Sequence, residues 1–150
     1  MQFFRKFIQN MVTQSRGIET TAFSEHDQEN LEQRQAWLVK DIVSRIDRGY
    51  SKVISCDDGW LELVFNCHSE LSAIDPNYTI YQIKEKFGTL RYYFSTTTAH
   101  QKEMSEIVSK YEKLSAITCE KTGTNGVLMK RNGFYKTLNP KLAENGFKVI

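Results

Sequence analysis

The chain has 150 residues and a formal net charge of +2, and 40% of its residues are hydrophobic and 25% charged. These proportions are those of an ordinary folded protein and exclude a disordered chain. A net charge this small does not predict binding to nucleic acid or to a membrane. A chain of this length can bury a sizeable core and form one domain.

The cysteines and the first residues bear on the compartment. Cys56, Cys67 and Cys119 form no CxxC pair, and their odd number argues against a disulfide framework. The start of the chain lacks the continuous apolar stretch of a secretory signal. No apolar run of about 18 residues occurs, so no membrane span is expected. These features indicate a reduced, cytoplasmic setting.

The chain opens with an expected amphipathic helix and connector over residues 1–23. We expect the helix to dock on the domain or on a partner rather than on a membrane, because Arg5 and Lys6 are the only cations on its polar face. A second helix is predicted from about Ser24 to Arg48, with Gly49 ending it. The apolar residues of the first helix are Phe3, Phe4, Phe7, Ile8, Met11 and Val12.

A third helix is predicted after the turn SCDDG at 55–59. Asp57 or Asp58 can cap it, and Asp75-Pro76-Asn77 ends it. Two aspartates beside Trp60 could also form a catalytic or metal-binding pair, but capping is the commoner role. The predicted buried face consists of Trp60, Val64, Cys67, Leu71 and Ile74, and His68 is interpreted as a surface histidine.

The stretch from Tyr78 to Ser95 is the densest run of β-forming residues. The tip Glu85-Lys86-Phe87-Gly88 divides it into two arms, which predicts a β-hairpin. Both faces of the arms carry aromatic or aliphatic side chains. Because a lone two-stranded ribbon is only marginally stable, we expect helices to cover one face and leave the other partly protected.

A further helix is predicted from a cap at Thr98 to about Ser115. The tail then reads as the turn TCEKTG, the strand GVLMK, a turn at Arg131-Asn132-Gly133, the strand FYKTL, and a last helical turn begun by Pro140. We expect one α+β domain over residues 1–150, with a helical and hairpin core at 24–116 and a tail at 117–150. The tail is slightly basic, which we interpret as a solvated surface formed by Lys121, Lys130, Arg131, Lys136, Lys141 and Lys148.

Three segments resemble a known family. GWLEL at 59–63, QIKEKFGTLRYYF at 82–94 and TCEKTG at 118–123 are similar in order and spacing to small proteins of phages and prophages. In that family a Gly-Trp helix start precedes a strand pair reading VKEKFGGLRFY, and a helix and a cysteine-bearing module follow. The resemblance covers roughly Cys56 to Leu138. It implies a compact α+β domain and no assigned reaction.

The tail departs from that family's zinc-knuckle pattern. Cys119 matches the first ligand, Thr122 stands at the second, and the later ligand region reads TLNP at 137–140. A tetrahedral zinc site needs four nitrogen or sulfur donors, so we expect no metal and no cofactor. Our hypothesis is a degenerate, treble-clef-like tail that keeps its shape without metal. The side chains expected to take the metal's place are Val127, Leu128, Phe134, Tyr135 and Leu138.

Motifs for catalysis are missing from the sequence. His26, His68 and His100 show no metal-ligand spacing, and GTNG at 123–126 lacks the Lys-Ser/Thr of a phosphate-binding loop. We therefore do not expect an enzyme. A pair of acid and base carboxylates needs no motif, so a small hydrolase remains a third class of function.

The hairpin offers the best candidate surface, because cations alternate there with aromatic side chains. Tyrosine and arginine often anchor protein interfaces, which favours a partner protein. We expect a non-enzymatic protein-binding module of mobile-element type that neutralises its partner, as immunity proteins and anti-defence inhibitors do. The alternative is a nucleic-acid-associated phage accessory protein that uses the same surface. The candidate residues are Tyr81, Lys84, Glu85, Lys86, Phe87, Arg91 and Tyr93.

Overall fold

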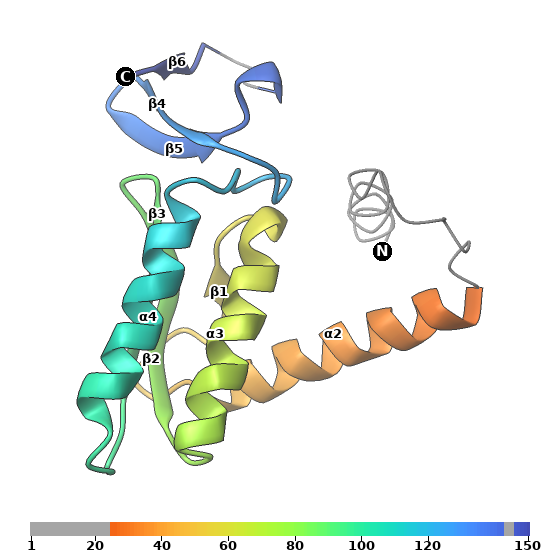
Figure 1. Cartoon of the computed structure of the whole chain (residues 1–150), viewed down its shortest axis with the longest axis vertical. Coiled ribbons are helices and arrows are strands. Elements are labelled where there is room, and N and C mark those ends of the chain that lie inside the picture. Colours follow the sequence, from red (N-terminus) through yellow and green to blue (C-terminus); the bar gives the residue numbers. More distant parts are fainter. Residues whose placement is uncertain (1–24, 143–145) are drawn as a thin grey trace. The chain divides into compact units, whose positions relative to one another are not determined.

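The computed structural model describes residues 25–142 and 146–150 (Figure 1). The chain divides into two compact units, Met1–Asp41 and Ile42–Ile150. The amphipathic helix expected within residues 1–23 lies outside the described residues. No helix in the described part of the chain is long and apolar enough to cross a membrane.

Helix α2 spans Glu25–Arg45 and ends before the predicted Arg48. Ile46 leaves the helix and forms a parallel β-bridge with Ile80, and the amide of Asp47 donates a 2.8 Å hydrogen bond to the Ile80 carbonyl. The helix ends early because this pairing with the hairpin replaces helical hydrogen bonds.

The predicted hairpin is confirmed and supplies two strands of a three-stranded sheet, with β2 at its centre. Strand β2 spans Thr79–Lys86 and β3 spans Thr89–Ser95, and they pair antiparallel. The turn is shorter than predicted, because Lys86 pairs with Thr89 and only Phe87-Gly88 remains between the strands. Strand β1, Ile54–Ser55, was not predicted and pairs parallel to β2.

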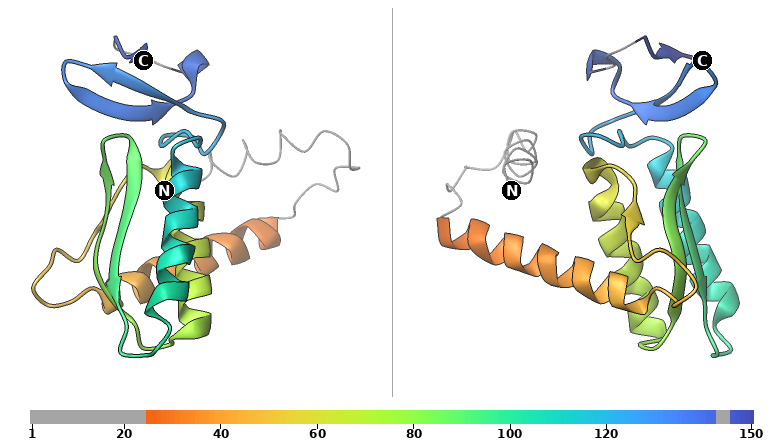
Figure 2. Two further views of the ribbon diagram at one scale, coloured as in Figure 1. Left: turned by 60° about the vertical axis from the view of Figure 1, so that its left-hand side comes forward. Right: turned by 180° about the vertical axis from the view of Figure 1, so that it is seen from behind.

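Two helices lie on one face of this hairpin (Figure 2). The short helix η1, Asp58–Trp60, leads into α3, Leu61–Ile74, and α4 spans Gln101–Ser115. The other face of the hairpin, with Lys84, Arg91 and Tyr93, stays partly or largely exposed. This confirms the α+β architecture with helices on one face of the hairpin. The buried side chains between the layers include Val64, Leu71, Ile80, Ile83, Leu90, Tyr92, Met104 and Val108.

The interpretation of His68 as a surface histidine is wrong. His68 is 3% exposed, and its Nδ1 lies 2.7 Å from the Tyr78 hydroxyl, which in turn lies 2.7 Å from the Tyr92 hydroxyl. The apolar face of α3 is wide enough to include His68, and hairpin hydroxyls satisfy the ring there. The network is buried and links α3 to Tyr78, which directly precedes β2, and to Tyr92 of β3.

The predicted helix caps are also wrong. Asp57 precedes η1 without accepting a capping hydrogen bond. Helix α4 begins after His100, and the Thr98 hydroxyl instead accepts a hydrogen bond from the His100 amide within the preceding turn. In the case of Asp57, the carboxylate instead accepts a 3.0 Å hydrogen bond from Lys136 of the tail.

The tail forms a second small sheet. Strands β4, Val127–Arg131, and β5, Phe134–Leu138, make the predicted hairpin, and η2, Pro140–Leu142, is the predicted helical turn. Strand β6, Lys148–Val149, was not predicted and pairs with β4.

The expected packing of the tail needs a correction. Its small core consists of Cys119, Met129 and Leu138, with Phe147 packed against them. Of the side chains predicted to replace the metal, only Leu138 is in this core, and Phe134 is 70% exposed. The TCEKTG turn brings Cys119 over the sheet, so a contact distant in sequence decides which tail residues are buried.

Candidate functional site

The face of the β2–β3 hairpin opposite helices α3 and α4 carries a compact group of cations and an aromatic ring. We call Lys84, Lys86, Arg91 and Tyr93 the open face. Lys84 lies directly opposite Arg91 in the strand register, and its Nζ is 5.8 Å from the centre of the Tyr93 ring. Lys86 follows on the same side of β2, since side chains alternate along a strand.

The Lys84–Arg91 pair is electrostatically unfavourable, because like charges directly opposite each other destabilise a sheet. Arg91 donates from Nη1 to the Thr89 hydroxyl at 2.5 Å and to the Leu90 carbonyl at 2.9 Å, and neither acceptor is charged. No ion pair found among residues 25–142 and 146–150 involves a cation of the open face. The open face is therefore a surface whose positive charge is not neutralised by described residues.

Tyr81 extends the aromatic part of this surface. Its ring lies 5.4 Å from the ring of Tyr50, and its hydroxyl donates a 2.9 Å hydrogen bond to Ser95. Tyr50 comes from the loop after α2 and is 48% exposed. Sequence reasoning missed Tyr50, because no local pattern connects that loop to the hairpin.

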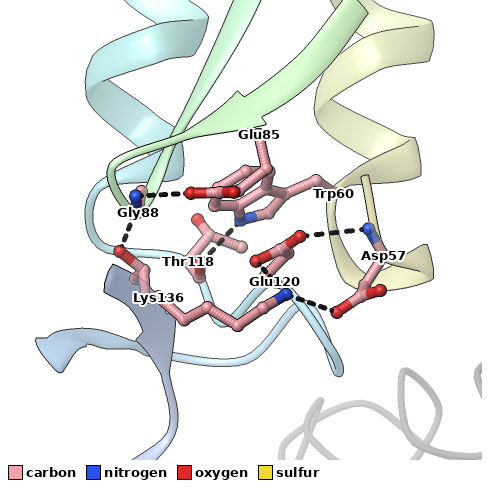
Figure 3. Close-up of polar contacts among 8 residues, drawn as sticks. Asp57, Trp60, Glu85, Gly88, Thr118, Glu120 and Lys136 are labelled. Carbon is pink, nitrogen blue, oxygen red and sulfur yellow. Dashed lines mark hydrogen bonds and ion pairs between the residues drawn. The ribbon is translucent and has the colours of Figure 1, made fainter. Parts of the chain in front are cut away.

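The remaining two candidate residues lie at the hairpin turn and face the tail. Glu85 accepts a 2.7 Å hydrogen bond from the Gly88 amide and so closes the turn (Figure 3). The Phe87 ring meets the Tyr135 ring edge to face, with centres 6.2 Å apart. The structure thus brings Tyr81, Lys84, Lys86, Arg91 and Tyr93 together along the strands and places Glu85 and Phe87 beside the tail.

The tail packs closely against the core at a junction formed by Gly59-Trp60, the hairpin turn and residues 118–123 and 137. The Trp60 indole donates a 2.7 Å hydrogen bond to the Thr118 carbonyl, and the Thr137 hydroxyl donates a 2.6 Å bond to the Gly88 carbonyl. A Cβ on Gly59 would lie 2.5 Å from both the Glu120 carbonyl oxygen and the Gly123 nitrogen. Only glycine fits at position 59 without moving this backbone.

This junction accounts for the segments that carry the family resemblance. The Gly-Trp pair at 59–60, the KFG turn at 86–88 and the TCE stretch at 118–120 are distant in sequence but meet where the tail docks (Figure 3). In this chain these segments therefore attach the tail to the core.

A buried carboxylate lies at the centre of the junction. Glu120 is 1% exposed, and its side chain accepts a hydrogen bond from the Asp57 amide at 3.3 Å and from Lys136 Nζ at 2.9 Å. Lys136 also reaches the Asp57 carboxylate at 3.0 Å. The interpretation of Lys136 as a solvated cation is therefore wrong, and neither motif nor spacing indicated its partners.

Burial raises the pKa of Glu120, and the hydrogen bond and charge of Lys136 offset this only in part. The pKa of Lys136 is itself raised, because its two carboxylate partners outweigh its own partial burial. The ion pair between Lys136 and Asp57 connects β5 of the tail to the residue that precedes η1.

The cysteines near the core are not activated as nucleophiles. Burial, with the negative charge of Glu120 as the next cause, raises the pKa of Cys56 to about 12. Burial also raises the pKa of Cys67. Both thiols are protonated at neutral pH, whereas a cysteine nucleophile acts as the thiolate.

Thr122 and Asn139, two residues at which the sequence departs from the zinc-knuckle pattern, lie beside Thr124 and contact its hydroxyl. The turn keeps its shape through a 2.8 Å hydrogen bond from the Gly123 amide to the Cys119 carbonyl. The hydroxyl of Thr122 lies 2.8 Å from that of Thr124, which accepts a 3.0 Å hydrogen bond from Asn139. No cluster of three or more His, Cys, Asp or Glu side chains suited to a metal ion occurs in the described part of the chain.

Comparison with protein-family models, with curated proteins and with solved structures finds no match to this chain. Function therefore has to be inferred from the geometry of the chain itself.

Proposed function

We propose that the chain is a non-enzymatic protein-binding module that neutralises a partner protein by covering an acidic patch on it. The observation that carries this proposal is the open face, where Lys84 and Arg91 stand opposite each other beside Tyr93. A repulsive pair of this kind is relieved when carboxylates of a partner approach it. Tyrosine and arginine are also side chains that frequently dominate binding energy at protein interfaces.

The family resemblance adds the setting. We propose that the module belongs to a mobile element, with a role like that of an immunity protein or an anti-defence inhibitor. We also place it in a reducing compartment such as the cytoplasm, which the three free cysteines support. The order of turn, hairpin and helical turn in residues 117–142 supports the treble-clef-like interpretation of the tail.

The test is a charge reversal with a matched control. Lys84→Glu/Arg91→Glu changes the sign of the pair but keeps its internal repulsion, so the fold is affected little. Lys102→Glu/Lys113→Glu changes the net charge by the same amount on exposed positions of α4. In pull-downs from source-cell extract, the wild type and the control variant should both retain an acidic protein, and the open-face variant should not. The same acidic protein, once purified, should bind the wild type directly.

A nucleic-acid accessory role would give a different result. Cations beside exposed aromatic rings also suit single-stranded nucleic acid, where bases stack on rings and phosphates pair with cations. In that case the open-face variant loses affinity for a labelled single-stranded oligonucleotide of any sequence, and wild-type affinity falls steeply with salt. If the wild type retains an acidic protein and does not bind the oligonucleotide, the partner is a protein and the nucleic-acid role is rejected.

A further inference from the structure

The chain contains two hairpin turns of the same kind with different residues at the first position. Phe87-Gly88 and Asn132-Gly133 each join two strands through a two-residue loop, between the pairs Lys86–Thr89 and Arg131–Phe134. The φ angles are 54° and 78° in the first turn and 47° and 84° in the second. Both turns are of the tight form that needs positive φ at each central residue.

Asparagine tolerates positive φ and is preferred at the first position of such a turn, whereas a bulky aromatic residue is an outlier there. The turn of the β2–β3 hairpin therefore keeps Phe87 at a positive φ angle, which a bulky aromatic residue disfavours. Neighbouring side chains hold this conformation, because Glu85 of the same hairpin accepts from the Gly88 amide and Thr137 of the tail donates to the Gly88 carbonyl. Strained residues of this sort persist chiefly where the side chain is needed.

Burial does not account for Phe87, because its side chain is 65% exposed. Its edge-to-face contact with Tyr135 covers only part of the ring. Two ammonium groups flank the pair of rings, since Lys86 Nζ is 5.6 Å from the centre of the Phe87 ring and Lys130 Nζ is 5.1 Å from that of Tyr135. We call these four residues the aromatic tip.

We propose that Phe87 is the anchor residue of the interaction surface and inserts into an apolar pocket of the partner protein whose rim carries carboxylates. The ring supplies apolar area for the pocket, and Lys86 and Lys130 match the acidic rim in charge. The aromatic tip is continuous with the open face, because Lys86 belongs to both. This inference rests on the proposed function and adds the shape and chemistry of the partner's site.

The first test uses the isolated full-length protein with Phe87→Asn. Since asparagine fits the backbone better and little burial is lost, the midpoint of urea unfolding should stay the same or rise. The same exchange at Phe134, which is 70% exposed and lies in β5, is the matched control. A clear fall of the midpoint for Phe87→Asn alone would mean that the ring serves the folded chain itself, which overturns the proposal.

The second test measures retention of the acidic partner from source-cell extract by the same variants. We expect Phe87→Asn to reduce binding at least tenfold and Phe134→Asn to leave it within twofold of wild type. If Phe87→Asn binds the partner as well as wild type and Lys84→Glu/Arg91→Glu does not bind it, then Phe87 is not the anchor residue. The proposed function is unaffected by that result. If Phe87→Asn loses binding and Lys84→Glu/Arg91→Glu keeps it, then Phe87 is the anchor residue and the open face does not contact the partner. If the wild type retains no acidic protein, both proposals fall.

Discussion

The ammonium group of Lys136 in β5 lies 2.9 Å from a carboxylate oxygen of Glu120, a residue that is 1% exposed. Both residues belong to the tail, and they join it to the core through Asp57, just before η1: Lys136 reaches the Asp57 carboxylate at 3.0 Å, and the Asp57 amide donates to Glu120 at 3.3 Å. Removing one partner of a buried pair leaves an uncompensated charge.

Lys136→Met should therefore destabilise the protein. The lysine side chain is 29% exposed, so water can partly replace it, and we expect a loss of roughly 1–3 kcal/mol in the free energy of unfolding. Urea unfolding gives this value. Lys141→Met, at an exposed position in η2, should cost little, and equal losses for both variants would contradict the role of the pair.

Glu120 also predicts a dependence of stability on pH. Because its pKa is raised in the folded state, the folded chain binds more protons than the unfolded chain above the ordinary carboxyl pKa of 4.5. Stability contributed by this group is then lost as the pH rises through that window. As the pH rises above 4.5, the free energy of unfolding of wild type should fall relative to that of Glu120→Gln.

Unfolding curves of both proteins across this pH range provide the measurement. A constant difference between them would mean that Glu120 has an ordinary pKa. A difference of the opposite sign would mean that Lys136 lowers that pKa more than burial raises it.

Gly59→Ala should weaken docking of the tail. The added methyl group would overlap the carbonyl groups of Cys119 and Glu120, and backbone cannot move aside as a flexible side chain can. Overpacking of this kind typically costs about 1–3 kcal/mol. Gly49→Ala is the control, since its Cβ would meet only the Asp47 side chain at 3.4 Å. Amide hydrogen exchange in residues 118–138 should accelerate in the first variant and not in the second.

Arg91→Glu should stabilise the protein while weakening partner binding. It converts the repulsive pair with Lys84 into an attractive one, for a gain of about 0.2–1 kcal/mol. The gain should shrink at high salt, because partly exposed charges are screened. If thermal unfolding shows no gain at low salt, then Lys84 and Arg91 do not repel each other measurably.

The tail should fold without a bound metal. Thr122, Thr124 and Asn139 form a hydrogen-bonded group in the turn where a zinc knuckle would need ligands, and one cysteine thiolate cannot hold zinc alone. A chelator should leave the urea midpoint unchanged, and elemental analysis of the purified protein should find far less than one zinc per chain. Stoichiometric zinc would contradict this.

The elements that could be predicted are those with a pattern inside their own segment. Alternating β-formers around Phe87-Gly88 indicated the hairpin, and helical periodicity placed α3 and α4. The Asn132-Gly133 turn likewise located the tail hairpin. In each case the residues that define the element lie within a few positions of one another, so periodicity and turn chemistry are sufficient.

The parts that could not be predicted depend on partners far away in sequence. Asp57 reads locally as a helix cap, but Lys136 binds it from the other end of the chain. His68 reads as a surface residue until Tyr78 supplies a buried hydrogen bond. Strands β1 and β6 also depend on distant partners. Each has two residues, and each forms a strand only because a longer strand pairs with it.

The order of contacts at the junction also has a consequence for synthesis. Trp60 and Gly88 leave the ribosome well before Thr118 and Thr137, which supply their hydrogen-bond partners. Until then the indole nitrogen and the turn carbonyl can be satisfied only by water. A nascent chain halted between α4 and β5 would thus display a hairpin end whose Trp60 side chain and Gly88 backbone still lack their tail partners.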